Sequence, residues 1–198
     1  MAVLTTLSTP EGFVLREWRE EDAAFLAATC SSSPELARQI GEARDEAEAL
    51  DWIARCHGRR ATGTAYAFAV TDGDAGPVLG NVAVSAVNRT HDSGWISYWT
   101  AEAARGRGVA VAGTRALADF CFGELALHRL ELGHRTNNPA SCAVALRAGF
   151  AVEGLERDKL RYGEARYDVE RHARLATDQG FGAHGGRPVV PPPHQPAR

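Results

Sequence analysis

Two arginines and two glycines lie close together in the run Arg105-Gly106-Arg107-Gly108-Val109-Ala110. The run follows a strand-like segment, residues 95–100, and precedes a helix-like segment, residues 110–122. The first amides of a helix have no helical partner, and the helix dipole favours negative charge at that end. Glycines let successive amides converge on an anion, and arginines add a permanent positive charge. The sequence therefore predicts a phosphate-binding loop.

The spacing of the loop narrows the class of ligand. A Walker loop requires a lysine after its last glycine, but Val109 follows Gly108. A dinucleotide fingerprint requires a third glycine where this chain has Val111. The pattern Arg-x-x-Gly-x-Ala, from Arg105 to Ala110, instead resembles the acyl-CoA pyrophosphate loop of the GNAT N-acetyltransferases.

Residues after the loop extend this resemblance. A predicted strand at 127–132 is followed by Asn138-x-x-Ser141, which begins a short helix that ends near Gly149-Phe150. This order is similar to the RimJ/RimL-type branch of the GNAT superfamily, over about residues 10–177 and most clearly over 95–154. The chain departs from that branch at Val111-Ala112, where many relatives have Thr-Glu, and at Ser97-Tyr98, where many have Gly-Tyr.

The resemblance implies an α+β fold with a mixed, mostly antiparallel central sheet of about seven strands, flanked by helices. We expect a loose lead-in over residues 1–10, an acetyltransferase domain over 11–177 and a disordered tail over 178–198. The tail prediction depends on composition, since five of the nine prolines lie between 188 and 196. Apolar spacing predicts two helix faces that pack inward: Leu50, Ile53 and Ala54 in one helix, and Ala110, Gly113, Leu117, Phe120 and Cys121 in the helix after the loop.

Composition limits the partners. The 198 residues carry 22 basic and 25 acidic side chains, a net charge of −3, which gives no general attraction to nucleic acid or to an anionic membrane. No apolar run approaches the roughly 20 residues of a membrane span, and the N-terminus does not resemble a signal peptide. We therefore expect a cytoplasmic monomer or homodimer. The four cysteines form no C-x-x-C pair, so no metal site is predicted.

By resemblance, acetyl-CoA is the co-substrate and the fourth and fifth strands of the sheet splay apart near Thr100 and His134. The loop amides and arginines would hold the pyrophosphate, the pantetheine would pair with the strand before the loop and with Asn138, and Ser141 would protonate the leaving thiolate. Asn138 and Ser141 could also simply cap their own helix. The expected cofactor residues are Trp99, Thr100, Arg105, Gly106, Arg107, Gly108, Val109, Ala110, Asn138 and Ser141.

A general base is harder to assign. His134 is the predicted base, because it lies near the expected splay and an ordinary histidine pKa of about 6.5 suits proton removal near neutrality. Two alternatives remain open: a group formed by Asp168, Glu170 and His172 on the last strand, and a chain of water molecules with no dedicated base. We expect the neighbouring Arg135 to be an exposed arginine.

The acceptor is expected to be a primary amine of modest pKa. An α-amine has a pKa of about 8 and a lysine about 10.4, so neutralising a lysine costs roughly 3 kcal/mol more. This favours a protein N-terminus or a small-molecule amine. The resemblance implies that segments 31–41 and 162–166 form the acceptor pocket, which Trp18, Trp95, Tyr98 and Trp99 could line. Two interpretations compete with this one: a non-catalytic CoA-binding sensor, and a structural or partner-binding domain whose Gly-rich turn is only a tight turn.

Overall fold

The computed structural model describes residues 6–41 and 43–178. The predicted tail, apart from Asp178, lies outside the described residues, as do the first five residues of the predicted lead-in. Within the rest of that lead-in, Leu7 and Ser8 form a short strand that pairs with Leu15 and Val14. The lead-in therefore contributes an edge to the sheet.

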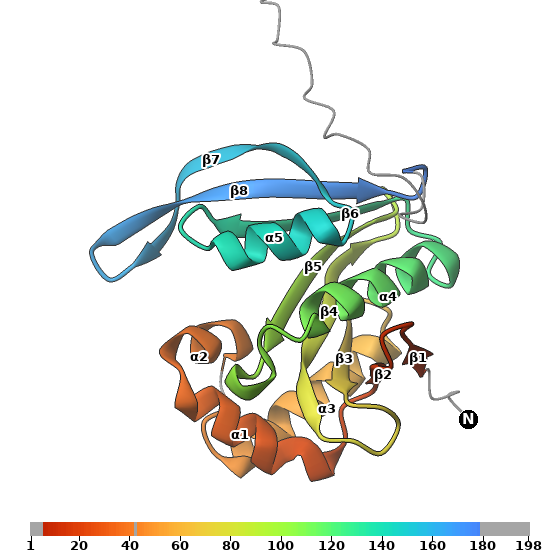
Figure 1. The fold of residues 1–198 in the computed structure, drawn as a ribbon, viewed down its shortest axis with the longest axis vertical. Helices are drawn as coiled ribbons and strands as arrows, with labels where there is room; N and C mark the ends of the chain where they lie inside the picture. The colour runs from red at the N-terminus through yellow and green to blue at the C-terminus, as the bar shows by residue number, and fades with distance from the viewer. Residues whose placement is uncertain (1–5, 42, 179–198) are drawn as a thin grey trace, which may run out of the picture.

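One mixed sheet organises the described residues, and Figure 1 shows it running through the whole molecule. Its eight strands have the order β1-β2-β3-β4-β5-β6-β8-β7, and only the β5–β6 pair is parallel. The predicted α+β class and the mostly antiparallel sheet are confirmed, and β1 makes the count eight where about seven were expected. The strands are β1 Leu7–Ser8, β2 Val14–Arg16, β3 Tyr66–Thr71, β4 Val78–Asn88, β5 Ser93–Thr100, β6 Arg129–Arg135, β7 Ala151–Tyr162 and β8 Ala165–Leu175.

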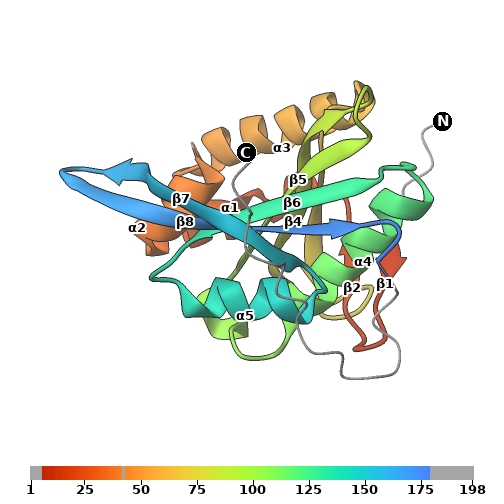
Figure 2. The same ribbon diagram turned by 90° about the horizontal axis from the view of Figure 1, so that it is seen from above.

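Helices cover both faces of this sheet (Figures 1 and 2). One apolar cluster joins α4 and the end of α5 to β2–β6, and a second joins α1, α2 and α3 to the opposite face. Short 3₁₀ turns at Glu20–Asp22 and Glu102–Ala104 precede α1 and α4. The helices are α1 Ala23–Ser32, α2 Pro34–Ile40, α3 Glu46–Ala61, α4 Val109–Gly123 and α5 Pro139–Arg147.

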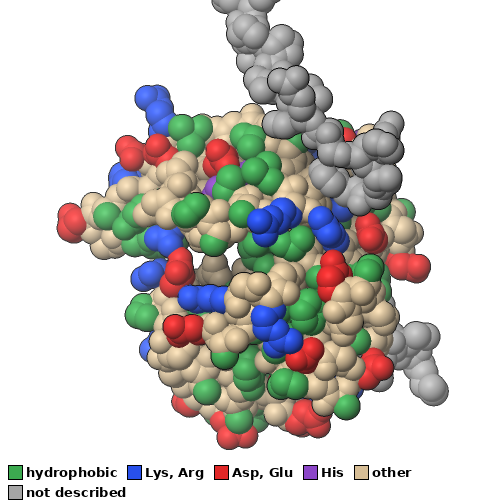
Figure 3. All heavy atoms as spheres, in the orientation of Figure 1, with side chains coloured by type: hydrophobic (Ala, Val, Ile, Leu, Met, Phe, Trp, Pro, Cys, Tyr) green, Lys and Arg blue, Asp and Glu red, His purple; other side chains and the backbone are tan. Residues whose placement is uncertain are grey.

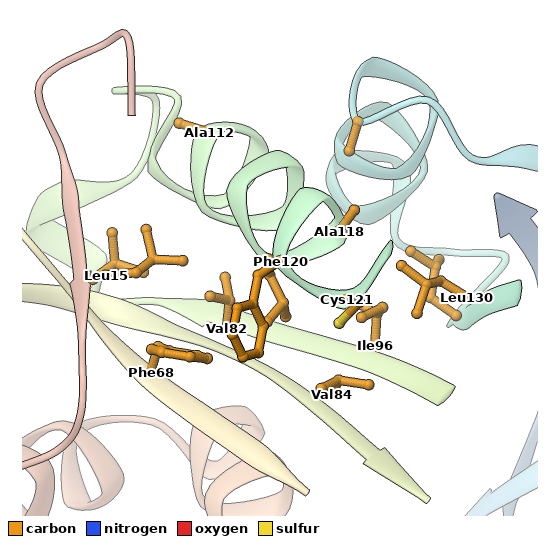
Figure 4. Close-up of a cluster of buried hydrophobic side chains, with 14 of the residues drawn as sticks. Leu15, Phe68, Val82, Val84, Ile96, Ala112, Ala118, Phe120, Cys121 and Leu130 are labelled. Carbon is orange, nitrogen blue, oxygen red and sulfur yellow. The ribbon is translucent and has the colours of Figure 1, made fainter. Parts of the chain in front are cut away.

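Helix α4 packs closely on the sheet, as Figure 4 shows for Phe120 above Phe68 and Val82. Most of its predicted inward face is buried, namely Gly113, Leu117, Phe120 and Cys121, whereas Ala110 is half-buried. A Cβ added to Gly113 would lie 2.9 Å from Val82 Cγ1, so glycine permits this approach. The close fit fixes the start of α4, and with it the loop, relative to the sheet.

The predicted inward face of α3 is partly wrong. Ile53 is buried, but Leu50 is 38% exposed and Ala54 is exposed. The buried stripe instead contains Ala49 and Ile53, four residues apart, because neighbours on one helix face recur at that spacing. Packing against α1 thus selects a face rotated from the one that the apolar residues suggested.

Strands β5 and β6 pair only at their beginnings, from Ser93 opposite Arg129 to Trp95 opposite Glu131. From Ile96 to Thr100, β5 pairs with β4 alone, while β6 continues beside β8. The splay predicted between the fourth and fifth strands is confirmed, and these strands are β5 and β6 because β1 adds one strand to the count. Figure 1 shows the two strands diverging. Backbone groups on one edge of β5 therefore face the opening between these strands.

Candidate active site

The loop between β5 and α4 has the backbone that its glycines predict. Gly106 and Gly108 have φ angles of +79° and +84°, a region that side chains disfavour. Gly108 is the N-cap of α4, and the first helical bond runs from Ala112 N to Gly108 O at 3.0 Å. The amides of residues 109–111 consequently have no helical acceptor. A ready anion site lies at this end of α4.

The loop borders a cavity of about 430 Å³, here called the cofactor cavity. Its other walls come from the end of β5 and from α5. Nine of the ten predicted cofactor residues line it: Trp99, Thr100, Arg105, Gly106, Gly108, Val109, Ala110, Asn138 and Ser141.

Arg107 is the exception. Its guanidinium lies 2.8 Å from Asp72 Oδ2 and over the ring of Phe13 at 5.9 Å, so it turns toward the β3–β4 loop. A phosphate contact by this side chain stays a prediction, and it requires the guanidinium to leave Asp72. Sequence alone gave no sign of the pair, because 35 residues separate its members.

Helix α5 begins as its first residues predict. The side chain of Asn138 caps it, with Oδ1 accepting from Ser141 N at 3.1 Å, and Pro139 occupies the first helical position. The cap uses the amide oxygen and leaves the amide NH₂ as the group available to a ligand. Capping and cofactor contact by Asn138 are thus compatible.

Tyr98 links the two sides of the splay. Its hydroxyl donates to Ser141 O at 3.0 Å, joining β5 to α5. Burial raises the pKa of Tyr98 to about 12, so the hydroxyl keeps its proton at neutral pH. The bond places Ser141 beside the edge of β5 that faces the opening.

A second cavity, of about 450 Å³, adjoins the first and is here called the acceptor cavity. Ser141, Tyr98 and Trp99 line both cavities, so the two meet at these residues. The space-filling view shows a hollow between the surfaces formed by α5 and α2 (Figure 3). A group-donating ligand in the cofactor cavity and a group-accepting ligand in the acceptor cavity would come together beside Ser141.

The walls of the acceptor cavity include both predicted segments, through α2 and through Tyr162. Trp95, Tyr98 and Trp99 also line it. Trp18 is instead buried in the core, with Nε1 donating to Asn81 Oδ1 at 2.9 Å. Seven further lining residues, from α3 and β4, were not predicted: Trp52, Cys56, Arg59, Asn81, Ala83, Val84 and Ser85. Asn81 and Ser85, polar residues within an apolar strand, were the available signals.

Arg135 is not the exposed arginine that was expected, since its side chain is 19% exposed. It pairs with Glu35 of α2 and lies over the rings of Tyr162 and Tyr167 at 5.4 and 5.3 Å. Glu35 and Arg135 both line the acceptor cavity, so their ion pair connects α2 to the end of β6 there.

His134 is buried, with 8% exposure, and belongs to a cluster. Its Nε2 lies 2.9 Å from His172 Nε2, which in turn lies 2.9 Å from Glu170 Oε1. Two separately predicted candidates for the base therefore form one group. Asp168 does not join it, because its carboxylate accepts from Asp158 N at 2.8 Å.

Comparison with known proteins identifies the family of this fold and site. The Acetyltransferase (GNAT) domain family matches residues 13–151, more than half of the chain. The chain belongs to the GNAT acetyltransferase family. No helix of this GNAT chain, within residues 6–41 and 43–178, has the length and apolar character that crossing a membrane requires.

Comparison with three similar GNAT proteins confirms the predicted resemblance to the RimJ/RimL-type branch. YdaF of Bacillus subtilis (strain 168), provisionally named a ribosomal N-acetyltransferase, is 30% identical over 100 residues, which cover 50% of this chain and 55% of YdaF. The ribosomal-protein-serine acetyltransferase of Escherichia coli (strain K12) is 28% identical over 102 residues, 52% of this chain and 57% of its own. The match thus spans little more than half the length of these relatives. A structure of Mycobacterium smegmatis RimJ in complex with CoA-disulfide has 26% identity and a TM-score of 0.74, covering 87% of each chain.

Proposed function

We propose that this GNAT protein moves the acetyl group of acetyl-CoA to a primary amine, either a protein N-terminus or a small-molecule amine. The observation that carries the proposal is the junction of the two cavities at Ser141 and Trp99, with the phosphate-type loop at one end. The named activity of the relatives and the CoA in the RimJ structure support it.

The cofactor would be held along β5 and the loop. Amides of residues 106–110 and the side chain of Arg105 would bind the pyrophosphate, with Arg107 as a further predicted contact. The pantetheine would pair with the free backbone edge of β5 at Trp99 and Thr100, and with the amide NH₂ of Asn138. These groups fit because all of them except Arg107 line the cofactor cavity.

Transfer would proceed by direct attack. The amine nitrogen forms a bond to the acetyl carbonyl carbon, and the carbonyl oxygen becomes an oxyanion that a β5 amide stabilises by roughly 3 kcal/mol. The carbon–sulfur bond then breaks, and the hydroxyl of Ser141 donates its proton to the departing thiolate. Ser141 regains a proton from water in the joined cavities.

Two routes fit removal of the proton from the attacking amine. In the first, His134 is the base, since its residue borders the acceptor cavity and its Nε2 adjoins His172 and Glu170. In the second, water in the acceptor cavity takes the proton. An acceptor of modest pKa lowers the demand on either route.

We propose a cytoplasmic location and a monomer or homodimer, with neither nucleic acid nor membrane as a partner. The net charge of −3 supports the absence of these two partners, because it provides no general attraction to polyanions.

Release of free thiol from acetyl-CoA, measured with a panel of amines and N-terminal peptides, tests the activity. The product should gain one acetyl group by mass spectrometry. A thermal shift with CoA but no turnover on any acceptor would favour the sensor module. No thermal shift with CoA would leave only a structural role for the loop.

A further inference from the structure

Four side chains with metal-binding atoms converge behind the acceptor cavity: His134 of β6, Cys142 of α5, and Glu170 and His172 of β8. We call them the His-Cys-Glu cluster. One ligand atom from each lies within 4.8 Å of all the others. His134 and His172 are buried, and Cys142 and Glu170 are half-buried.

A backbone carbonyl lies at the far side of each imidazole. His134 Nδ1 lies 3.1 Å from Arg135 O, and His172 Nδ1 lies 3.5 Å from Phe150 O. A carbonyl only accepts, so the 3.1 Å contact favours a ring proton on Nδ1 of His134. His134 Nε2 then carries a lone pair that lies 2.9 Å from His172 Nε2, and in the absence of metal the His172 Nε2 proton is shared with the carboxylate of Glu170 at 2.9 Å. Such backbone contacts to Nδ1 are the usual support of a histidine that coordinates metal through Nε2.

The carboxylate of Glu170 brings a further ligand-type oxygen to the same place. Glu170 Oε1 is 2.9 Å from His172 Nε2 and 3.4 Å from His134 Nε2, and Cys142 Sγ is 3.5 Å from the same oxygen. Among the salt bridges of the described residues, Glu170 pairs only with these two histidines. Four ligand-type atoms thus meet in a largely buried place, where a divalent cation would replace the protons that otherwise join them.

We infer that the His-Cys-Glu cluster binds a divalent zinc ion. Two imidazoles, a thiolate and a carboxylate are the ligand types that zinc prefers, in the number that completes a tetrahedron. Zinc–ligand bonds of about 2.0–2.3 Å place neighbouring ligand atoms about 3.3–3.8 Å apart. The observed separations run from 2.9 Å to within 4.8 Å, so zinc binding requires shifts of up to about 1 Å.

A zinc ion here would fasten α5 to β6 and β8. Cys142 directly follows Ser141, so the metal would hold the first turn of α5 at the junction of the cavities. A His134 nitrogen that coordinates zinc cannot accept a proton, and the amine proton would then go to water. The role inferred for the metal is positional, and metal binding is measured without acetyl-CoA or amine. Failure of this inference is therefore distinguishable from failure of the proposed transferase activity.

The experiment uses the full chain, purified without a histidine tag and freed of metal with a chelator. Zinc alone should bind at one ion per chain by elemental analysis. It should raise the unfolding temperature by about 5–10 °C at a free concentration roughly 100 times the Kd. Cobalt, as a spectroscopic substitute, should give tetrahedral visible bands and a thiolate charge-transfer band in the near ultraviolet.

Variants decide which residues bind. Cys142→Ser should abolish the charge-transfer band and weaken binding at least tenfold, and His172→Gln should also weaken it. Cys56→Ser and His128→Gln, outside the cluster, should leave both spectrum and affinity unchanged. Absence of stoichiometric zinc, as a purely hydrogen-bonded cluster would give, overturns the inference. A cobalt spectrum that Cys142→Ser leaves unchanged also overturns the inference. This second result decides the question even if His172→Gln, a substitution at a buried position, fails to fold.

Discussion

The hydroxyl of Tyr98 donates to the carbonyl oxygen of Ser141 at 3.0 Å, across the point where β5 and β6 have separated. Tyr98 belongs to β5, and Ser141 to the first turn of α5. The edge of β5 that faces the opening and the proposed proton donor are thus held together by one hydrogen bond. This bond fixes a distance that catalysis by Ser141 would require.

Removal of the Tyr98 hydroxyl should weaken the attachment of α5 to β5. Tyr98→Phe is expected to lower the free energy of unfolding by about 1 kcal/mol, the usual net contribution of one hydrogen bond. It should also lower kcat more than it raises the KM for acetyl-CoA. Denaturant unfolding and steady-state kinetics measure the two effects. Tyr66→Phe, a half-buried tyrosine away from both cavities, is the control, and equal effects of the two variants would contradict the role of Tyr98.

Stability should fall at alkaline pH. Burial raises the pKa of Tyr98 and of Cys121 to about 12, above their unfolded values of about 10 and 8.5. Both groups stay protonated in the folded state while the unfolded chain ionises, so stability is fully present below pH 8.5 and declines up to about pH 12. Each group contributes a slope of at most about 1.4 kcal/mol per pH unit. Unfolding free energies measured from pH 8 to 11 should show this decline, and Tyr98→Phe should flatten it above pH 10.

A negative charge in the loop should oppose cofactor binding. Gly108→Asp places a carboxylate at the N-terminus of α4, against the expected pyrophosphate. Gly108→Asn is the matched control, since asparagine has nearly the same shape and shares the strain of the +84° φ angle. The Kd for CoA, from calorimetry, should be at least tenfold weaker for aspartate than for asparagine. Equal affinities would place the phosphates elsewhere.

Ser141→Ala tests the proton donor. Loss of a general acid typically slows a reaction 10²-fold or more, so kcat should fall by roughly that factor while CoA affinity changes less than threefold. Ser141→Cys, which keeps an acidic proton at the same place, should recover part of the rate. An unaltered kcat in the alanine variant removes Ser141 from the mechanism.

Features that depend on interactions within one turn of the chain could be predicted from the sequence. The glycines at 106 and 108 predict positive φ angles, and Asn138-Pro139 predicts a capped helix, because each effect acts within one turn of the chain. Apolar spacing also predicted most of the buried face of α4. These features, with the family resemblance, led to the sheet and the splay, and nine of the ten residues predicted to bind the cofactor line one cavity.

Contacts between distant segments could be decided only by the tertiary structure. Glu35 meets Arg135 across 100 residues, and His134 meets His172 across 38. Both depend on which elements become neighbours, a result of packing that no local spacing encodes. The same packing set the rotation of α3 and turned Arg107 toward Asp72. Sequence therefore determined the local shape of the glycine loop, while the folded chain decided which charged, imidazole and thiol side chains meet beside the acceptor cavity.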